Sequence, residues 1–179
     1  MSEPARLVVV IGSDDAGAAY RERLVATLEA SEHVEQVVDI GVRADDPTPY
    51  PNIGLAAAEM VADGRADRAL LVCGTGLGMA ISANKVRGVR AVTAHDGYSV
   101  ERAVLSNDAQ VLTLGARVIG PELAQRLVRE WVGYRFDPTS ASAAKVKVIA
   151  DYDAAHSGDA QGEGAGDGAA DVAGGTSCG

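Results

Sequence analysis

Short apolar runs recur along the chain and alternate with segments that have helical spacing. Continuous apolar runs are typical of strands buried on both faces, which occur in parallel sheets. The runs predict strands at residues 7–11, 34–40, 69–72, 89–94 and 110–114. The intervening segments predict helices at residues 16–30, 53–61, 79–85, 98–105 and 121–132. Because parallel strands need right-handed crossovers, we expect an α/β fold with a five-stranded parallel sheet covered on both faces.

The composition suits one domain followed by a tail. Apolar residues make up 47% of the 179 residues while aromatic residues make up only 4%, a mixture that fits Val-rich strands and Ala/Leu-rich helices. We assign the domain to residues 1–156. Residues 157–179 consist mainly of Gly, Ala, Asp and Ser, and we expect them to be a disordered tail without chemistry.

The charge and the termini exclude several classes of partner. A formal net charge of −9 argues against binding to nucleic acid or to an anionic membrane, although a small anionic substrate remains compatible with a locally positive site. No apolar run approaches the ~20 residues of a membrane span, and the first residues lack the features of a signal peptide. The two cysteines, Cys73 and Cys178, do not suggest a disulfide framework, so the cytoplasm is the expected location.

A glycine-rich motif follows the third expected strand and opens a helix: Cys73-Gly74-Thr75-Gly76-Leu77-Gly78-Met79. Alternate glycines leave backbone N–H groups uncovered, and such a loop can hold a phosphate or an oxyanion. The alternative is an ordinary tight turn between strand and helix. The spacing is neither that of a Walker loop nor Gly-x-Gly-x-x-Gly.

Cys73 ends the strand beside these amides. Positive potential there favours a thiolate, which can act as a general base toward a bound substrate. The alternative is a small buried apolar side chain, the commoner fate of a free cysteine. No His/Cys/carboxylate cluster has metal-ligand spacing, so we expect neither a metal nor another cofactor.

Polar residues at other element ends are further candidates. Asp14 and Asp15 follow the first strand and either bind substrate hydroxyls or cap the next helix. Asn107 precedes the fifth strand and either donates to an enediolate oxygen or serves as a turn residue. Arg117 follows that strand and is a candidate to point into the crevice. His95 is a conceivable acid, although a single histidine is more often structural.

The ordered set of motifs resembles the ribose-5-phosphate isomerase B / galactose-6-phosphate isomerase family over about residues 6–153. Besides the cysteine-containing loop, the motifs are Gly12-Ser13-Asp14-x-Ala16-Gly17, Tyr50-Pro51, Ala83-Asn84-Lys85-Val86, Gly88-Val89-Arg90-Ala91, Tyr98-Ser99, Asn107-Asp108-Ala109 and Leu114-Gly115-Ala116-Arg117-Val118-Ile119-Gly120. The resemblance implies a Rossmann-like three-layer α/β/α sandwich, a metal-free reaction on a phosphorylated sugar, and a homodimer whose active sites are shared between subunits.

The resemblance also implies roles for individual residues. Cys73 would transfer the proton, the backbone amides of the 74–78 loop and Asn107 would stabilise an enediolate, and Thr75 and Asp14 would contact the sugar. The candidate catalytic residues are therefore Cys73, Thr75 and Asn107. The candidate substrate-binding residues are Asp14, Asp15, Gly74, Gly76, Gly78, Arg117 and Lys145.

The sequence departs from the pentose-phosphate members of that family. Asp15 and Ser106 stand where those members usually have histidines, the second of which is credited with opening the sugar ring. The arginine-rich phosphate motif is also reduced: residues 137–144 contain no Arg, and Lys145 stands near where one would fall. A lysine holds phosphate as a point charge but not bidentately.

These departures favour a four-carbon substrate. A tetrose 4-phosphate has its O4 esterified and cannot close a furanose ring, so its isomerase needs no ring-opening acid. Residues 100–110 also resemble the branch of the family that acts on D-erythrulose 4-phosphate. We therefore predict interconversion of D-erythrulose 4-phosphate and D-erythrose 4-phosphate in the catabolism of tetritols such as erythritol.

Three other interpretations remain open. The first is the same chemistry on ribulose 5-phosphate and ribose 5-phosphate. The second is a non-catalytic phosphate-binding α/β module in which Cys73 is a core residue. The third, a structural dimerisation domain, ranks last because it gives the glycine-rich crevice no purpose.

Overall fold

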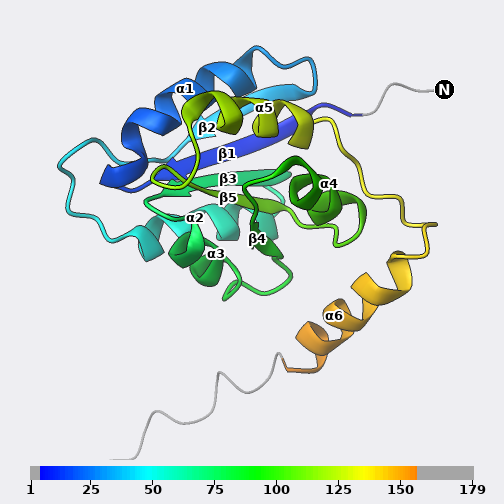
Figure 1. Cartoon of the computed structure of the whole chain (residues 1–179). Coiled ribbons are helices and arrows are strands. Elements are labelled where there is room, and N and C mark those ends of the chain that lie inside the picture. The colour runs from blue at the N-terminus through cyan, green and yellow to red at the C-terminus, as the bar shows by residue number, and fades with distance from the viewer. Residues whose placement is uncertain (1–4, 157–179) are drawn as a thin grey trace, which may run out of the picture.

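The structure, a computed structural model, describes residues 5–156 and has a five-stranded sheet at its centre (Figure 1). The strands are β1 (Leu7–Ser13), β2 (Val34–Asp39), β3 (Arg68–Cys73), β4 (Ala91–Thr93) and β5 (Val111–Gly115). All neighbouring strands are parallel, in the order β2-β1-β3-β5-β4. The prediction of a five-stranded parallel sheet is confirmed.

The helices form two layers around the sheet, as Figure 1 shows. They are α1 (Ala18–Glu29), which follows the short 3-10 helix η1 (Asp15–Gly17), and α2 (Tyr50–Ala62), α3 (Leu77–Ala83), α4 (Gly97–Leu105), α5 (Pro121–Trp131) and α6 (Ala143–Ala155). The helices α1, α4 and α5 cover one face, and α2 and α3 cover the other. Right-handed crossovers explain the division, because the face that a helix covers depends on the direction in which the chain crosses the sheet.

Side chains of the strands alternate between two cores, one under each helix layer. In β3, Leu70 and Val72 belong to the core shared with α1, α4 and α5. Their neighbours Leu71 and Cys73 belong to the core shared with α2 and α3. This alternation sends the Cys73 side chain to the α2–α3 side of the sheet. The predicted three-layer α/β/α sandwich is thus confirmed.

Helix α6 is the element that the sequence did not predict. Its segment includes the run Lys145-Val146-Lys147-Val148-Ile149, in which the β-branched residues are weak helix formers. No α6 residue is buried, and its contact with the domain includes the Gly88 N–H, which donates to the Asp153 carboxylate at 3.1 Å. The missing prediction has a physical reason, since the helix lacks a face that packs on the sheet. The expected tail at residues 157–179, with Cys178, lies outside the described residues.

Within residues 5–156, no helix has both the length and the apolar character that a bilayer span requires.

A buried arginine at the start of β3 joins this strand to the end of α5. Arg68 is 7% exposed and donates to the carbonyl oxygens of Trp131 and Tyr134, at 2.6 Å each. Its guanidinium also lies 5.3 Å from the centroid of the Trp131 ring. Burial, and then the neighbouring cation of Arg135, lower the pKa of Arg68 to about 10, so it stays charged at neutral pH. The cation satisfies carbonyls at the end of α5, where the helix dipole is negative.

Replacing Arg68 with alanine should lower the free energy of unfolding by about 2–4 kcal/mol, because buried carbonyls at the end of α5 lose their donors. Urea denaturation followed by circular dichroism measures this change. The control is Arg65→Ala, which removes an exposed guanidinium paired with Asp63 and should change stability by less than about 0.5 kcal/mol. Equal stability of the two variants would contradict the role given to Arg68.

Candidate active site

The carboxyl ends of β1 and β3 lie where the chain changes direction across the sheet. From β1 the chain moves outward to β2, and then returns to place β3 on the other side of β1. The helices that follow β1 and β3 therefore leave toward opposite faces, and ligands of such sheets bind in the crevice between them. The two ends are also joined, because the Asp14 N–H donates to the Val72 carbonyl at 3.3 Å.

Cys73 is buried beneath the glycine-rich loop. The residue is only 5% exposed and packs in the core under α2 and α3. Its Sγ accepts a hydrogen bond from the Gly76 N–H at 3.1 Å. A donor directed at sulfur stabilises a negative charge there. Both interpretations drawn from the sequence thus describe part of the geometry: the side chain is buried, and its sulfur is polarised by the loop.

The loop turns back over the sulfur through Gly76. Its φ of 81° lies in the left-handed region that favours glycine, and a Cβ there would stand 3.1 Å from the backbone of Leu114. Thr75 is exposed at the tip, where its Oγ1 is 3.4 Å from the Leu77 N–H that donates to it. The loop that connects β3 to α3 therefore packs closely against Leu114 of β5, and it presents Thr75 to solvent.

Arg117 lies against this loop. Its N–H donates to the Gly74 carbonyl at 3.0 Å, and a Cβ on Gly74 would stand 3.4 Å from its Nη1 atom. The side chain is exposed and can turn toward an anion. The Arg117 guanidinium, a cation beside the glycine-rich loop, can bind the phosphate group of a small substrate even though the chain has a negative net charge.

Asp14 and Asp15 lie on the same edge of the sheet. The Asp14 carboxylate accepts from the Gly17 N–H at 3.0 Å, so Asp14 does cap η1. Burial raises the pKa of Asp14; the charge of Asp15 adds to this effect, and that of Arg117 opposes it. The structure therefore brings Asp14, Asp15 and Arg117 to the edge of the sheet where Cys73 and Thr75 also lie.

His95 holds the end of β5. Its Nε2 accepts from the Gly115 N–H at 2.9 Å, so the neutral ring carries its proton on Nδ1. Burial lowers the pKa of His95, while Asp96 opposes the shift. Gly115 is in register with Cys73. The hydrogen bond to Gly115 gives His95 a structural role, and its Nδ1–H is the proton that it could donate.

Asn107 lies near the opposite edge of the sheet. The backbone there is held by Arg90, whose Nε donates to the Asn107 carbonyl at 3.0 Å. Gln110, three residues on, accepts at its carbonyl from the Ala69 N–H near the start of β3. Cys73 is four residues farther along β3, about 13 Å at ~3.3 Å per residue. One chain therefore does not bring Asn107 to Cys73.

Lys145 is also separated from the crevice. It is exposed in the first turn of α6, which lies beyond the amino edge of the sheet (Figure 1). The candidate residues thus form two groups within one chain. Asp14, Asp15, Arg117 and the 73–78 loop share the carboxyl edge, whereas Asn107 and Lys145 do not.

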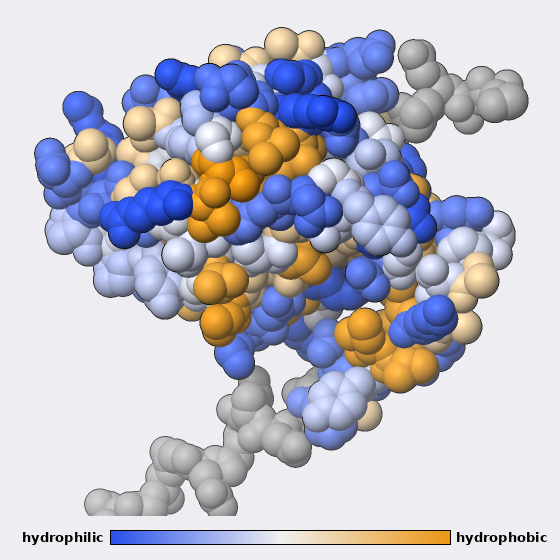
Figure 2. All heavy atoms as spheres, viewed as in Figure 1, coloured by the Kyte–Doolittle hydropathy of each residue, from blue (hydrophilic) through white to orange (hydrophobic). Residues whose placement is uncertain are grey.

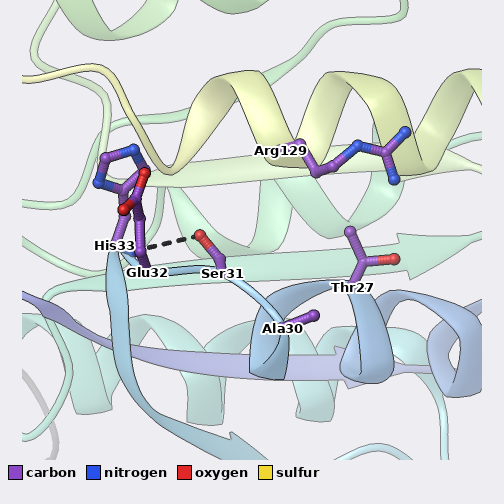
Figure 3. Close-up of a pocket in the computed structure, with 6 residues that line it drawn as sticks. All are labelled: Thr27, Ala30, Ser31, Glu32, His33 and Arg129. Atoms are coloured by element: carbon purple, nitrogen blue, oxygen red, sulfur yellow. Dashed lines mark hydrogen bonds between the residues drawn. The ribbon is translucent and has the colours of Figure 1, made fainter.

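The surface has hollows beside both groups. A hollow of about 590 Å³ borders the start of α1 and includes Arg43. One of about 280 Å³ runs along the outer strand β4 and includes Tyr98, Arg102 and Asn107. A third, of about 370 Å³, lies between the ends of α1 and α5 (Figure 3) and is lined by Thr27, Ala30, Ser31, Glu32, His33 and Arg129. This third hollow contains no candidate residue and lies at the amino edge.

Among residues 5–156, no group of three or more His, Cys, Asp or Glu side chains is arranged to hold a metal ion.

One residue near the site received no role from the sequence. Tyr50 begins α2, and its ring lies over Gly78 in the first turn of α3. The available signal was a tyrosine directly before a proline, next to a helix start, in a chain with few aromatic residues. That signal marks the position but not what the ring touches, since the contact joins residues far apart in sequence.

Comparison with known proteins finds sugar-phosphate isomerases as relatives. A family described as Ribose/Galactose Isomerase matches residues 9–149. A D-erythrulose-4-phosphate isomerase 2 from Mycolicibacterium smegmatis is 63% identical over 150 residues, covering 83% of this chain and 99% of that protein. A D-erythrulose-4-phosphate isomerase from Pectobacterium atrosepticum is 40% identical, covering 82% of this chain and 95% of that protein.

A solved structure agrees with these sequences. The type B ribose 5-phosphate isomerase from Trypanosoma brucei superimposes with a TM-score of 0.77 at 35% identity, covering 83% of this chain and 99% of that one. The family match runs from within β1 into α6. The chain belongs to the ribose/galactose isomerase family.

Proposed function

We propose that this protein is a cytoplasmic aldose–ketose isomerase that interconverts D-erythrulose 4-phosphate and D-erythrose 4-phosphate. The observation that carries the proposal is the buried Cys73 sulfur held by the Gly76 N–H at the switch point of the sheet. The four-carbon substrate is supported by the 63% identity to a relative with that name. The cytoplasm suits a catalytic free thiol, which must stay reduced.

The reaction is a proton transfer between adjacent carbons. The Cys73 thiolate takes a proton from C1 of the ketose, the C–H electron pair forms the C1–C2 double bond, and the carbonyl electrons move to O2. A proton then passes from O1 to O2. The thiol returns its proton to C2 while the O1 electrons form the aldehyde carbonyl. No atom is gained or lost in the cycle.

The surrounding groups match the charges of this reaction. Main-chain N–H groups of the 74–78 loop stabilise the enediolate oxygen, because fixed dipoles in a water-poor crevice need no reorganisation. Asp14 and Asp15 are the proposed acceptors for substrate hydroxyls. Arg117, and Lys145 from a second subunit, are the proposed phosphate partners.

We further propose a homodimer with shared active sites. Asn107 and Lys145 complete the site only if a second copy brings them to the carboxyl edge. The α6 helix supports this arrangement, because it exposes Val148 (68%), Ile149 (47%) and Tyr152 (65%) and buries no residue within its own chain. Figure 2 shows apolar side chains gathered on α6. Such a face is stabilised when a second copy covers it.

A second candidate function is the isomerisation of ribose 5-phosphate, favoured by the superposition on a type B ribose 5-phosphate isomerase. Against it stands Ser106, which supplies no imidazole for opening a furanose ring. Its hydroxyl lies 3.5 Å from the Arg102 Nη1 atom.

Replacing Cys73 with serine should lower kcat by about 10²–10⁴-fold, because a hydroxyl is a far weaker base than a thiolate. The measurement is turnover of D-erythrulose 4-phosphate, with circular dichroism to verify folding. Cys178→Ser is the matched control and should retain full turnover. Unchanged turnover in Cys73→Ser would remove the proposed base and favour a non-catalytic module.

The four-carbon substrate should exceed the five-carbon one in kcat/KM by at least about tenfold, or ~1.4 kcal/mol of transition-state preference. The comparison uses D-erythrose 4-phosphate and D-ribose 5-phosphate under the same conditions, because only the aldopentose phosphate closes a furanose ring. Ser106→His should narrow the difference when ribose 5-phosphate is the substrate. A tenfold preference for the pentose phosphate would refute the substrate while leaving the isomerase chemistry in place.

Mixing two inactive variants should restore activity if the sites are shared. Cys73→Ser and Asn107→Ala each impair both sites of a homodimer, whereas a mixed dimer contains one intact site. Random reassortment should therefore recover about a quarter of wild-type turnover. The measurement is turnover after co-refolding equal amounts, with each variant refolded alone as control. No recovery in a verified mixed dimer would mean that Asn107 acts within its own chain, and full activity of Asn107→Ala alone would mean that it takes no part.

A further inference from the structure

Tyr50 occupies the space that a side chain at position 78 would need. A Cβ on Gly78 would stand 2.4 Å from the Tyr50 Cε2 atom, 2.6 Å from Cζ and 2.9 Å from the hydroxyl oxygen. Gly78 is not among the positive-φ glycines of residues 5–156, so its backbone does not require glycine. A side chain at position 78 would therefore displace the Tyr50 ring.

The ring lies on the surface beside the glycine-rich loop rather than in a core. Tyr50 is 42% exposed. A large aromatic side chain on the surface, fixed by a close contact with a backbone, contributes shape rather than buried area. The contact with Gly78 therefore holds the first turn of α3 in position.

A second contact sets the distance between the same two helices. A Cβ on Gly54 of α2 would stand 3.0 Å from the Ser82 Cβ of α3. The Ser82 hydroxyl in turn donates to the Gly78 carbonyl at 2.8 Å. Helix α2 thus fixes α3 both at its first turn and near its end.

The first turn of α3 leads directly to the sulfur. The Ala80 N–H donates to the Gly76 carbonyl at 3.1 Å, which fastens Gly76 to the turn that Tyr50 covers. The Gly76 N–H, on the other side of the same residue, donates to Cys73 Sγ at 3.1 Å. A shift of this turn would therefore move the donor away from the sulfur.

We propose that Tyr50 is a positioning residue for the reaction: its ring fixes the first turn of α3 and so keeps the Gly76 N–H directed at Cys73 Sγ. Tyr50 acts through Gly78 and Gly76 and touches no reacting atom. The inference rests on the proposed function in taking Cys73 as the base, but the reactivity of the thiol can be measured without turnover.

The experiment uses the full chain in a Cys178→Ser background, where Cys73 is the remaining cysteine. The readouts are kcat, KM and the pH dependence of Cys73 alkylation by iodoacetamide. Tyr50→Ala and Tyr50→Leu should lower kcat by about 10–100-fold, with KM changed less than about threefold, and should move the alkylation profile to higher pH. Tyr50→Phe keeps the ring and should stay within about twofold of wild type in every readout.

Gly78→Ala should reproduce the effect of Tyr50→Ala, because the added methyl displaces the ring. The Tyr50→Ala/Gly78→Ala double variant should lose less than the product of the two single losses, since both disturb one contact. Gly120→Ala is the matched control, because its Cβ would meet its nearest atom only at 3.8 Å. Thermal melts verify that each variant is folded.

Two results would overturn the proposal. One is a folded Tyr50→Ala or Tyr50→Leu variant with wild-type kcat and an unshifted alkylation profile. The other is a Tyr50→Phe variant as impaired as Tyr50→Ala, which would assign the effect to the hydroxyl. A wild-type protein without isomerase turnover would refute the proposed function alone, since the alkylation profiles still test Tyr50.

Discussion

The right-handedness of crossover connections determines where this protein can do chemistry. Because the chain crosses from β1 to β2 in one direction and from β3 to β4 in the other, the helices after β1 and β3 leave toward opposite faces of the sheet. Ligands of such sheets bind at the carboxyl ends of the strands at this point. The polar residues that follow β1 and the cysteine that ends β3 occupy this one place. The catalytic proposal depends on that topological consequence.

Within the crevice, burial and main-chain donors act together on one sulfur. Cys73 is nearly covered, which by itself would disfavour charge, yet the Gly76 N–H is directed at it. The loop can supply this donor because Gly76 adopts a positive φ and Gly78 leaves room for the Tyr50 ring. The glycines of the motif therefore have separate physical causes. One permits a backbone turn, and another permits a close approach between helices.

The candidate site residues of a single chain lie in two groups at opposite ends of the strands. The carboxyl edge has the thiol, two carboxylates and Arg117, while Asn107 and Lys145 lie at the other edge or beyond it. The same chain extends α6 with exposed apolar residues and no buried ones. A homodimer that covers α6 and joins unlike edges would account for both observations with a single arrangement. Oligomerisation would then be a condition of catalysis as well as of stability.

The sequence by itself determined the alternation of strands and helices, the five-stranded parallel sheet, most helix positions and the loop that carries Cys73. These follow from local periodicity, from glycine spacing and from the handedness of crossovers, all of which are encoded in neighbouring residues. It did not reveal α6, because a helix without a packed face has no periodic signal. The tertiary structure alone decided that Tyr50 lies on Gly78, that His95 accepts from Gly115 and that Asn107 is remote from Cys73. Each of these depends on contacts between residues distant along the chain, whose geometry is set by how whole elements pack.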